Sequence, residues 1–382
     1  MVSMQMSGYF DNAATTVMSQ SALQTYVETA RSYPANPSSS HSEGRRAAAL
    51  LSQSRERVAS LLKTESEHIT FTAGATEAND IILSSLLWRP QSGQVVFSGI
   101  EHSSILQWNQ LLAHLGWTVT TVAAPSGFID PQQLAAALTA KTRLVSVMLV
   151  NNTVGTIQDI GAIRSAVRRF ESESGQPPIH IHSDATQALG KIDVDLAHLG
   201  VDSASFSAHK FHGPRGVGIL YNTKASTQSL SRGGGQERGL RAGTENLPAI
   251  AAMVTALEEA IGALEENRRT VTALNTLLRS RLRELPIITP EEQSSPYILT
   301  IAIPSLPSEV GERMLSDRGF SVSAGSACSH NVRQKGAMVH NAMRLDSRLA
   351  ESSLRISLSP DNTTEECEAL AEAILTIHRN HR

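Results

Sequence analysis

A lysine between two histidines is the residue in this sequence whose setting first suggests chemistry. Lys210 follows a run of small and apolar residues from Ser203 to Ala208, with His209 before it and His212 after it. A lysine held at the end of a buried strand is partly desolvated, and its lowered pKa lets the amine act as a nucleophile or form a Schiff base. Because a lone lysine after a strand is more often exposed to solvent, its interpretation depends on the rest of the chain.

Polar residues follow most of the predicted strands. We expect the strands at residues 67–72, 94–97, 117–122, 144–150, 179–182, 203–208 and 216–221. Helices alternate with them, which predicts an α/β fold with a mostly parallel sheet covered on both faces. In such sheets the ligand site lies beyond the carboxyl ends of the strands. The polar residues at these ends are Thr76, His102, Asn152, Asp184, Gln187, His209 and Lys210.

The first strand end has the arrangement of an anion-binding turn. The strand at 67–72 runs into Ala73-Gly74-Ala75-Thr76, and a helix begins there. Free backbone N–H groups and the dipole at a helix N-terminus both favour a phosphate. Many turns of this kind bind nothing, so the signal counts only together with the lysine.

The sequence holds two cysteines in different surroundings. Cys328 has small residues on both sides, which predicts an exposed loop and a reactive thiol. Cys367 lies in the predicted closing helix at 363–378, where we expect it to pack or to have no role. So few cysteines favour a reduced, cytoplasmic protein.

The composition is that of an ordinary soluble protein. Its 382 residues carry 33 Lys and Arg against 36 Asp and Glu, and the net charge of −3 gives no reason to expect nucleic acid. No apolar run approaches the roughly 20 residues of a transmembrane helix, so no membrane is expected. The first residues, Met1 to Gly8, show no signal-peptide pattern.

The later part of the chain predicts a second unit. A glycine-dense stretch at 231–246, with Arg, Glu and Asn interleaved, fits a tight functional loop. A long helix over 248–285, with a possible break, then leads to strands at 297–303 and 355–358. We expect a large cofactor-binding domain at 15–255 and a smaller α+β domain at 1–14 and 256–382, which carries the cysteine loop.

Taken together, these residues suit pyridoxal 5′-phosphate. Lys210 would hold its aldehyde, and Asp184 would pair with the pyridinium nitrogen so that the ring acts as an electron sink. The turn that contains Ala75 and Thr76 would hold the phosphate together with Ser207 and His209. His102 would stack on the ring.

Segments across nearly the whole chain resemble the NifS/IscS-type cysteine desulfurases, in the class V aminotransferase group of fold-type I pyridoxal-phosphate enzymes. This resemblance implies a seven-stranded, mostly parallel sheet between helices, plus a smaller α+β domain. The segments that carry it lie at residues 9–16, 36–39, 71–79, 101–102, 150–152, 182–187, 207–210, 213–218, 233–246, 325–328 and 354–358.

The resemblance also implies roles at matching positions. Gln187 would reach the phenolic oxygen of the cofactor ring, and Thr244 would bind the phosphate of a neighbouring subunit, which implies a homodimer with shared sites. Asn152 and Arg355 would hold the substrate α-carboxylate, and an arginine fork suits a carboxylate on physical grounds too. Cys328 would accept the sulfur.

The implied reaction converts L-cysteine to L-alanine. Lys210 would remove the Cα proton, and the thiolate of Cys328 would attack the substrate sulfur and keep it as a persulfide for an acceptor protein. His102 would assist proton transfer. An iron–sulfur scaffold or a thiolation enzyme are both possible acceptors, and DNA sulfur modification would use the same persulfide.

From the sequence alone, other functions remain open. A selenocysteine lyase or a cysteine/cystine lyase would share Lys210 and Asp184, and a cofactor-free binding protein could keep the fold. A metal site at His180 and His182 lacks further ligands at a suitable spacing. Thr153 stands where the family usually has Glu, a change that could alter hydrogen bonding near the cofactor.

Overall fold

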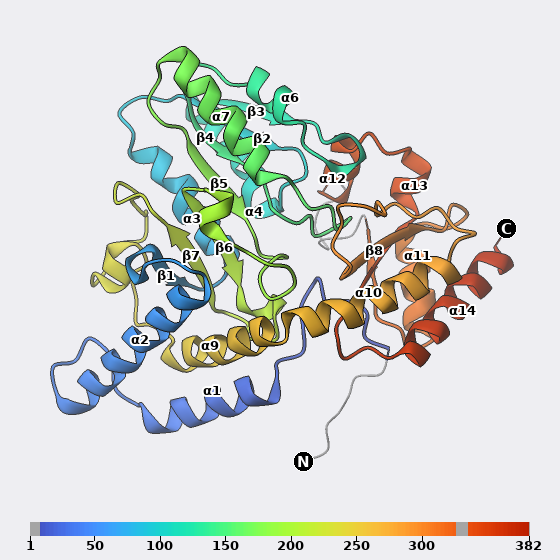
Figure 1. The fold of residues 1–382 in the computed structure, drawn as a ribbon, viewed down its shortest axis with the longest axis horizontal. Coiled ribbons are helices and arrows are strands. Elements are labelled where there is room, and N and C mark those ends of the chain that lie inside the picture. Colours follow the sequence, from blue (N-terminus) through green and yellow to red (C-terminus); the bar gives the residue numbers. More distant parts are fainter. Residues whose placement is uncertain (1–7, 326–334, 382) are drawn as a thin grey trace.

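The computed structural model describes residues 8–325 and 335–381. Figure 1 shows a larger part built around a central sheet and a smaller part that holds most of the C-terminal third of the chain.

A seven-stranded sheet forms the centre of the larger part. Its strands are β1 (Ile69–Thr72), β2 (Gln94–Ser98), β3 (Thr118–Val122), β4 (Thr142–Ser146), β5 (His180–Asp184), β6 (Ser203–Ser207) and β7 (Gly218–Asn222). They lie in the order β1-β7-β6-β5-β4-β2-β3. Only β7 runs antiparallel to its neighbours, and the other pairs are parallel. The predicted α/β fold with a mostly parallel sheet is confirmed.

One predicted strand is too long. The apolar run at 144–150 is buried throughout, but β4 ends at Ser146. Beyond it the backbone still follows β5, since Val147 donates to His182 and Leu149 to Asp184. Hydrophobicity alone predicted the burial, whereas the regular ladder stops where the chain begins to bend toward the site.

Helices cover both faces of the sheet. They are α1 (Gln20–Ser32), α2 (Ser42–Leu61), α3 (Ala75–Ser84), α4 (Ser103–Leu106), α5 (Trp108–His114), α6 (Pro131–Ala136), α7 (Ile160–Ser174), α8 (Leu196–Leu199) and α9 (Leu247–Gly262). Neighbouring strand residues point into different cores, as alternation in a strand requires. Val96 joins the core formed with α2, α7 and α9, whereas Val95 and Phe97 join the core formed with α3, α4 and α5.

The smaller part has its own sheet and core. Its elements are α10 (Leu264–Arg281), β8 (Ile298–Ala302), α11 (Ser308–Ser316), β9 (Ser323–Ala324), α12 (Lys335–Ala342), α13 (Ser347–Glu351), β10 (Ser353–Ser357) and α14 (Thr364–Asn380). The strands are antiparallel, in the order β8-β10-β9. Phe10, near the other end of the chain, packs into this core beside α10 and α14.

A bend between α9 and α10 marks the passage from one core to the other. The two helices differ in direction by 70°, and this is the break allowed for in the predicted long helix. The side chains of α9 up to Ala260 belong to the first core, and those of α10 from Val271 belong to the second. The division into a large domain at residues 15–255 and a smaller one at 1–14 and 256–382 stays a prediction. In the described ranges, no single helix is long and apolar enough to cross a membrane.

Candidate active site

A cavity of about 720 Å³ lies at the carboxyl ends of the central strands. It brings together most of the residues that the sequence singled out. Those that line it are Ala75, Thr76, His102, Asn152, Asp184, Gln187, Ser207, His209, Lys210 and Arg355.

Lys210 reaches the cavity from a short turn. The turn at Ala208–Lys210 follows β6 directly, so the strand fixes where the amine emerges. The Nζ atom donates to the backbone carbonyls of Ala13 at 2.8 Å and Ala14 at 2.7 Å. These carbonyls come from the N-terminal segment, which thus holds the amine at the cavity wall.

Asp184 ends β5 and is buried, at 3% exposure. Its Oδ1 accepts from the backbone N–H of Thr186 at 3.0 Å, and its Oδ2 accepts from Nδ2 of Asn79 at 3.1 Å. A buried carboxylate needs such donors, because burial without them is costly. The arrangement gives the cavity one fixed acceptor for a positively charged N–H group.

The start of α3 forms an open anion site on the cavity wall. Gly74 is the N-cap of this helix, and no side chain of the described residues caps it. The first N–H groups of an α-helix have no partner within the helix. Gly218 lets the turn pack closely, since a Cβ there would lie 2.6 Å from Cα of Gly74. Ser207 and Thr76 line the same cavity, so the N–H groups and hydroxyls together suit a phosphate.

His209 and His102 both lie on the cavity wall. Burial, followed by the charge of Lys210, lowers the pKa of His209 to about 4. Its Nδ1 lies 3.2 Å from Oγ1 of Thr15. His102 caps α4, and its Nδ1 accepts from the backbone N–H of Ser104 at 3.2 Å. Because Nδ1 of His102 accepts this bond, the ring proton is on Nε2.

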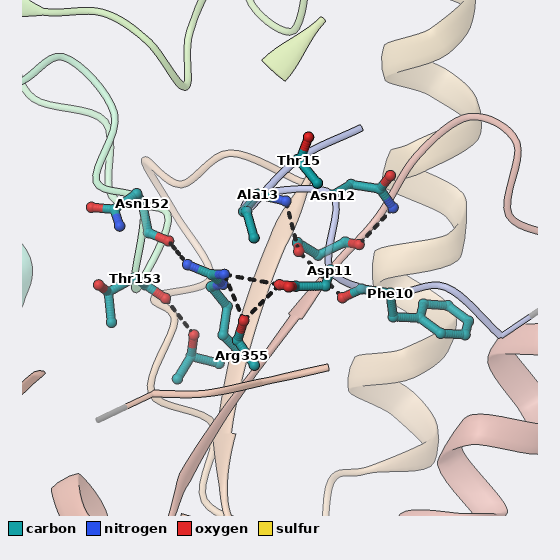
Figure 2. A network of polar contacts seen from close by, with 12 residues as sticks. Phe10, Asp11, Asn12, Ala13, Thr15, Asn152, Thr153 and Arg355 are labelled. Carbon is teal, nitrogen blue, oxygen red and sulfur yellow. Dashed lines mark hydrogen bonds and ion pairs between the residues drawn. The ribbon is translucent and has the colours of Figure 1, made fainter. Parts of the chain in front are cut away.

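Arg355 approaches the cavity from β10 and is almost fully buried, at 3% exposure. Figure 2 shows its guanidinium between Asp11 and Asn152. One NH₂ group donates to Oδ1 of Asp11 at 2.9 Å, and the other donates to the backbone carbonyl of Asn152 at 2.9 Å. The Nε–H group is buried and has no hydrogen-bond partner within the described part of the chain. Guanidinium groups pair readily with carboxylates, and Arg355 lines the cavity.

Asn152 and Thr153 contribute backbone rather than side-chain bonds to this network. The carbonyl of Thr153 accepts from the hydroxyl of Thr300 at 2.5 Å, and its N–H donates to Oδ1 of Asn151 at 2.9 Å. The side chain of Thr153 is not among those that line the cavity.

The amide of Gln187 has a fixed orientation. Its Nε2 donates to the carbonyl of Ala13 at 2.8 Å, and its Oε1 accepts from Nζ of Lys191 at 2.8 Å. Lys191 is buried, and burial lowers its pKa to about 7, with smaller contributions from Lys210 and Arg355. The lysine therefore determines which end of the amide faces Ala13.

Two predicted site residues are not brought into the cavity by the described chain. Thr244 is exposed, and its hydroxyl accepts from Nδ2 of Asn36 at 3.4 Å. Cys328 lies outside the described residues. Cys367 is buried, and burial raises the pKa of its thiol to about 12, which fits a packing role.

Sequence reasoning missed several residues of the site. Thr15 and Arg215 line the cavity, and both lie in segments quoted above for other reasons. Glu101 is buried near Asp184, and burial raises its pKa to about 8. Asn79 and Lys191 act through Asp184 and Gln187. The sequence pattern gave no signal for Asn79, because its partner Asp184 comes from another element. Lys191 lies in the turn after β5 and contacts Gln187 four residues earlier.

The donor set fits pyridoxal 5′-phosphate. The cavity offers an amine at Lys210, a buried carboxylate at Asp184 and an uncapped helix start for a phosphate. In the described residues no group of three His, Cys, Asp or Glu side chains could hold a metal ion.

Known proteins resemble this chain over its whole length. The model of the aminotransferase class-V family matches residues 8–370. A NifS/IcsS protein homolog of Lactobacillus delbrueckii subsp. bulgaricus is 38% identical over 381 residues, covering 97% of both chains. A cysteine desulfurase of Bradyrhizobium diazoefficiens is 35% identical over 376 residues, covering 97% of this chain and 94% of the relative. The solved structure of a NifS-like protein, 35% identical, covers 98% of this chain and 100% of its own, with a TM-score of 0.91.

The chain therefore belongs to the class V aminotransferase family of enzymes. Within that family its relatives are cysteine desulfurases and NifS-like proteins. The predicted family, enzyme class and fold are confirmed.

Proposed function

We propose that this protein is a pyridoxal-phosphate-dependent cysteine desulfurase. It converts L-cysteine to L-alanine and keeps the sulfur as a persulfide on Cys328. The observation that carries the proposal is the cavity that Lys210, Asp184, the uncapped start of α3 and Arg355 line together.

The cofactor-binding residues divide by the part of the cofactor that they hold. Lys210 would bind the aldehyde, Asp184 the pyridine nitrogen and Gln187 the phenolic oxygen. The helix start at Ala75 and Thr76 would hold the phosphate together with the side chains of Ser207 and His209, and His102 would stack on the ring. When bound, the cofactor supplies an electron sink that stabilises negative charge at the substrate Cα.

The substrate is positioned by its carboxylate. The orientation of the Arg355 guanidinium is fixed by Asp11, by Ser323 and by the backbone carbonyl of Asn152. A carboxylate that accepts from this group, with the side chain of Asn152 beside it, places the substrate Cα next to Lys210. The amine of Lys210 then takes the Cα proton.

The sulfur step uses the thiol of Cys328. Its thiolate attacks the substrate sulfur, the C–S bond breaks and an S–S bond forms, and the electron pair of the broken bond stays with the carbon skeleton. Protons from Lys210 and from the thiol complete alanine, so that cysteine and an enzyme thiol give alanine and an enzyme persulfide. His102, with its proton on Nε2, is placed to assist.

Partners follow from the same proposal. Thr244 is exposed on the glycine-rich loop, so it is free to contact the phosphate of a second copy of the chain in a homodimer. The persulfide passes to an acceptor protein, an iron–sulfur scaffold or a thiolation enzyme. Two cysteines in 382 residues are typical of a protein from a reducing compartment, and we assign the protein to the cytoplasm.

A comparison of the two cysteines tests the proposal. Alanine formation from L-cysteine is measured with dithiothreitol present, which releases the bound sulfur as sulfide. Cys328→Ala should lower the rate by roughly a thousandfold or more, because the nucleophile is lost. Cys367→Ala should stay within a fewfold of the parent, since that thiol is buried and protonated.

The contrary outcomes are specific. If Cys328→Ala formed alanine and sulfide at the parental rate, the enzyme would be a lyase that needs no protein thiol, with selenocysteine as the next substrate to assay. A parent that forms no alanine while binding the cofactor would overturn the desulfurase assignment.

A further inference from the structure

A line of buried polar side chains runs behind Asp184 and away from the cavity. Asn79, His182 and Ser203 are each fully buried, at 0% exposure. Oδ1 of Asn79 lies 2.9 Å from Nε2 of His182, and Nδ1 of His182 lies 2.8 Å from Oγ of Ser203. Oγ of Ser203 in turn lies 2.7 Å from Nε2 of the partly buried His180. The line thus connects Asp184 through Asn79 to the far end of β5.

Every hydrogen bond in this line has a determined direction. Oδ2 of Asp184 accepts from the NH₂ group of Asn79, so Oδ1 of that amide faces His182. Nε2 of His182 must then carry a proton. Burial lowers the pKa of His182 to about 4, so the ring is neutral and its Nδ1 accepts.

The remaining links follow from this assignment. Ser203 has one hydroxyl proton and donates it to Nδ1 of His182, so Nε2 of His180 must be the donor to Ser203. All the donors therefore point toward Asp184. A chain of this kind stabilises negative charge at its end, since each bond polarises the next.

Asn79 has a second branch that leads to His102. The other proton of its NH₂ group goes to Oγ of Ser104 at 2.8 Å. Oγ of Ser104 lies 2.8 Å from Nδ1 of His102, which also accepts from the N–H of Ser104. The hydroxyl of Ser104 therefore donates to His102 and keeps the proton of that ring on Nε2.

We propose that Asn79 is a positioning residue that orients both Asp184 and His102, and that His182 and Ser203 fix its amide for this purpose. This inference rests on the proposed function, in which Asp184 meets the pyridine nitrogen and His102 the ring face. The amide of Asn79 thereby stabilises negative charge at Asp184 and fixes the tautomer of His102. Asparagine suits the position, because Asp184 and Ser104 each need a donor and His182 needs an acceptor.

The test measures the bound cofactor rather than turnover. Pyridoxal phosphate labelled with ¹⁵N in the ring is titrated into cofactor-free protein, giving a dissociation constant and the ¹⁵N chemical shift of the pyridine nitrogen. In Asn79→Asp, a second carboxylate replaces the donor to Asp184. The dissociation constant should rise roughly tenfold to a hundredfold, and the nitrogen signal should move toward the unprotonated form.

A buried asparagine elsewhere provides the matched control. Asn275 on α10 is also buried and bonded through both ends of its amide, to Pro296 and Arg279. Asn79→Leu and Asn275→Leu should both lower the free energy of unfolding, but only Asn79→Leu should change the cofactor constants. Equal cofactor affinity and an unchanged nitrogen signal in both variants would reduce Asn79 to a structural role and overturn the proposal.

Milder variants separate the two branches and cover the case in which the Asn79 variants do not fold. His182→Gln keeps a donor toward Asn79 and should retain the parental nitrogen signal, whereas His182→Leu should lose it. Ser104→Ala should leave the nitrogen signal in place but change the ring ¹⁵N shifts of His102. The inference would be contradicted if His182→Leu retained the parental nitrogen signal while His182→Gln lost it. It would also be contradicted if Ser104→Ala changed the nitrogen signal but not the ring shifts of His102. If the parent protein bound no cofactor, this result would instead contradict the proposed function itself.

Discussion

Two cavities share Lys210 as a lining residue, but their surroundings differ. Lys210 faces the cavity described above, whereas Lys191 lines a second cavity of about 590 Å³. Lys191 is 5% exposed, and its pKa of about 7 is the kind of value expected for a reactive amine. By burial and pKa alone, Lys191 would be a strong candidate for the cofactor lysine.

The two cavities differ at the helix N-terminus that lies beside each lysine. In the first cavity the start of α3 has no side-chain cap among the described residues. In the second, the start of α1 is capped by Ser19, whose hydroxyl donates to the carboxylate of Glu259 at 2.7 Å. An acidic group therefore already occupies the place that an anion would take. A perturbed lysine identifies a cofactor site only where open anion donors and a buried acceptor surround it.

Replacing each lysine should give the largest contrast between the two cavities. Lys210→Ala removes both the covalent anchor and the base, so alanine formation should fall by at least about a thousandfold. Activity is followed with saturating pyridoxal phosphate, and binding by absorbance. A Lys210→Ala protein with more than about a tenth of the parental rate would contradict the assignment.

The carboxylate site of the first cavity can be tested at Arg355. Arg355→Lys keeps the charge opposite Asp11 but loses the planar fork, so the KM for L-cysteine should rise roughly tenfold to a hundredfold with a smaller change in kcat. Steady-state kinetics separate the two constants. An unchanged KM would remove Arg355 from substrate binding.

Lys191 should matter less than either residue. Lys191→Met keeps most of the volume and removes the donor to Gln187, while the bond from Gln187 to Ala13 remains. We expect kcat/KM to fall by less than about tenfold. A loss as large as that of Lys210→Ala, with the protein still folded by circular dichroism, would erase the distinction between the cavities.

Glu101 should affect stability rather than rate. Its pKa is raised to about 8 in the folded protein, so its contribution to stability is complete below its ordinary pKa and is lost as pH rises through about 8. Glu101→Gln is neutral at every pH and lacks this loss. Between about pH 5 and pH 8.5, the urea midpoint of the variant should rise relative to the parent. A constant difference between the two proteins would show that Glu101 is already ionised.

The sequence was informative where a residue type and its strand-end position coincide. The alternation of elements predicted the sheet, and Asp184, Ser207 and Lys210 follow from β5 and β6 because parallel strands end at one edge. Arg355 came from resemblance, since its place in the cavity depends on how the small sheet docks. The position of Cys328 lies outside the described residues, so its role stays a prediction.

What the sequence could not provide is contact between distant segments. Asn79 and Asp184 are 105 positions apart, and Lys210 meets Ala13 across 197 positions. In the sequence, Asn79 is a single polar residue within a predicted helix. Nothing in its neighbours distinguishes it from a partly exposed asparagine. Asn79 contacts several polar side chains at once only because α3 packs against β5 and β6. The apolar run after β4 predicted a longer strand than the structure has. Its side chains stay buried beyond the point where the regular strand pairing ends.

One measurement tests the central claim most directly. The protein is incubated with pyridoxal phosphate, reduced with borohydride and digested, and the modified lysine is located by mass spectrometry. The account predicts a pyridoxyl group on the peptide that contains Lys210 and none on the peptide that contains Lys191. Modification at Lys191, or at neither lysine, would contradict it.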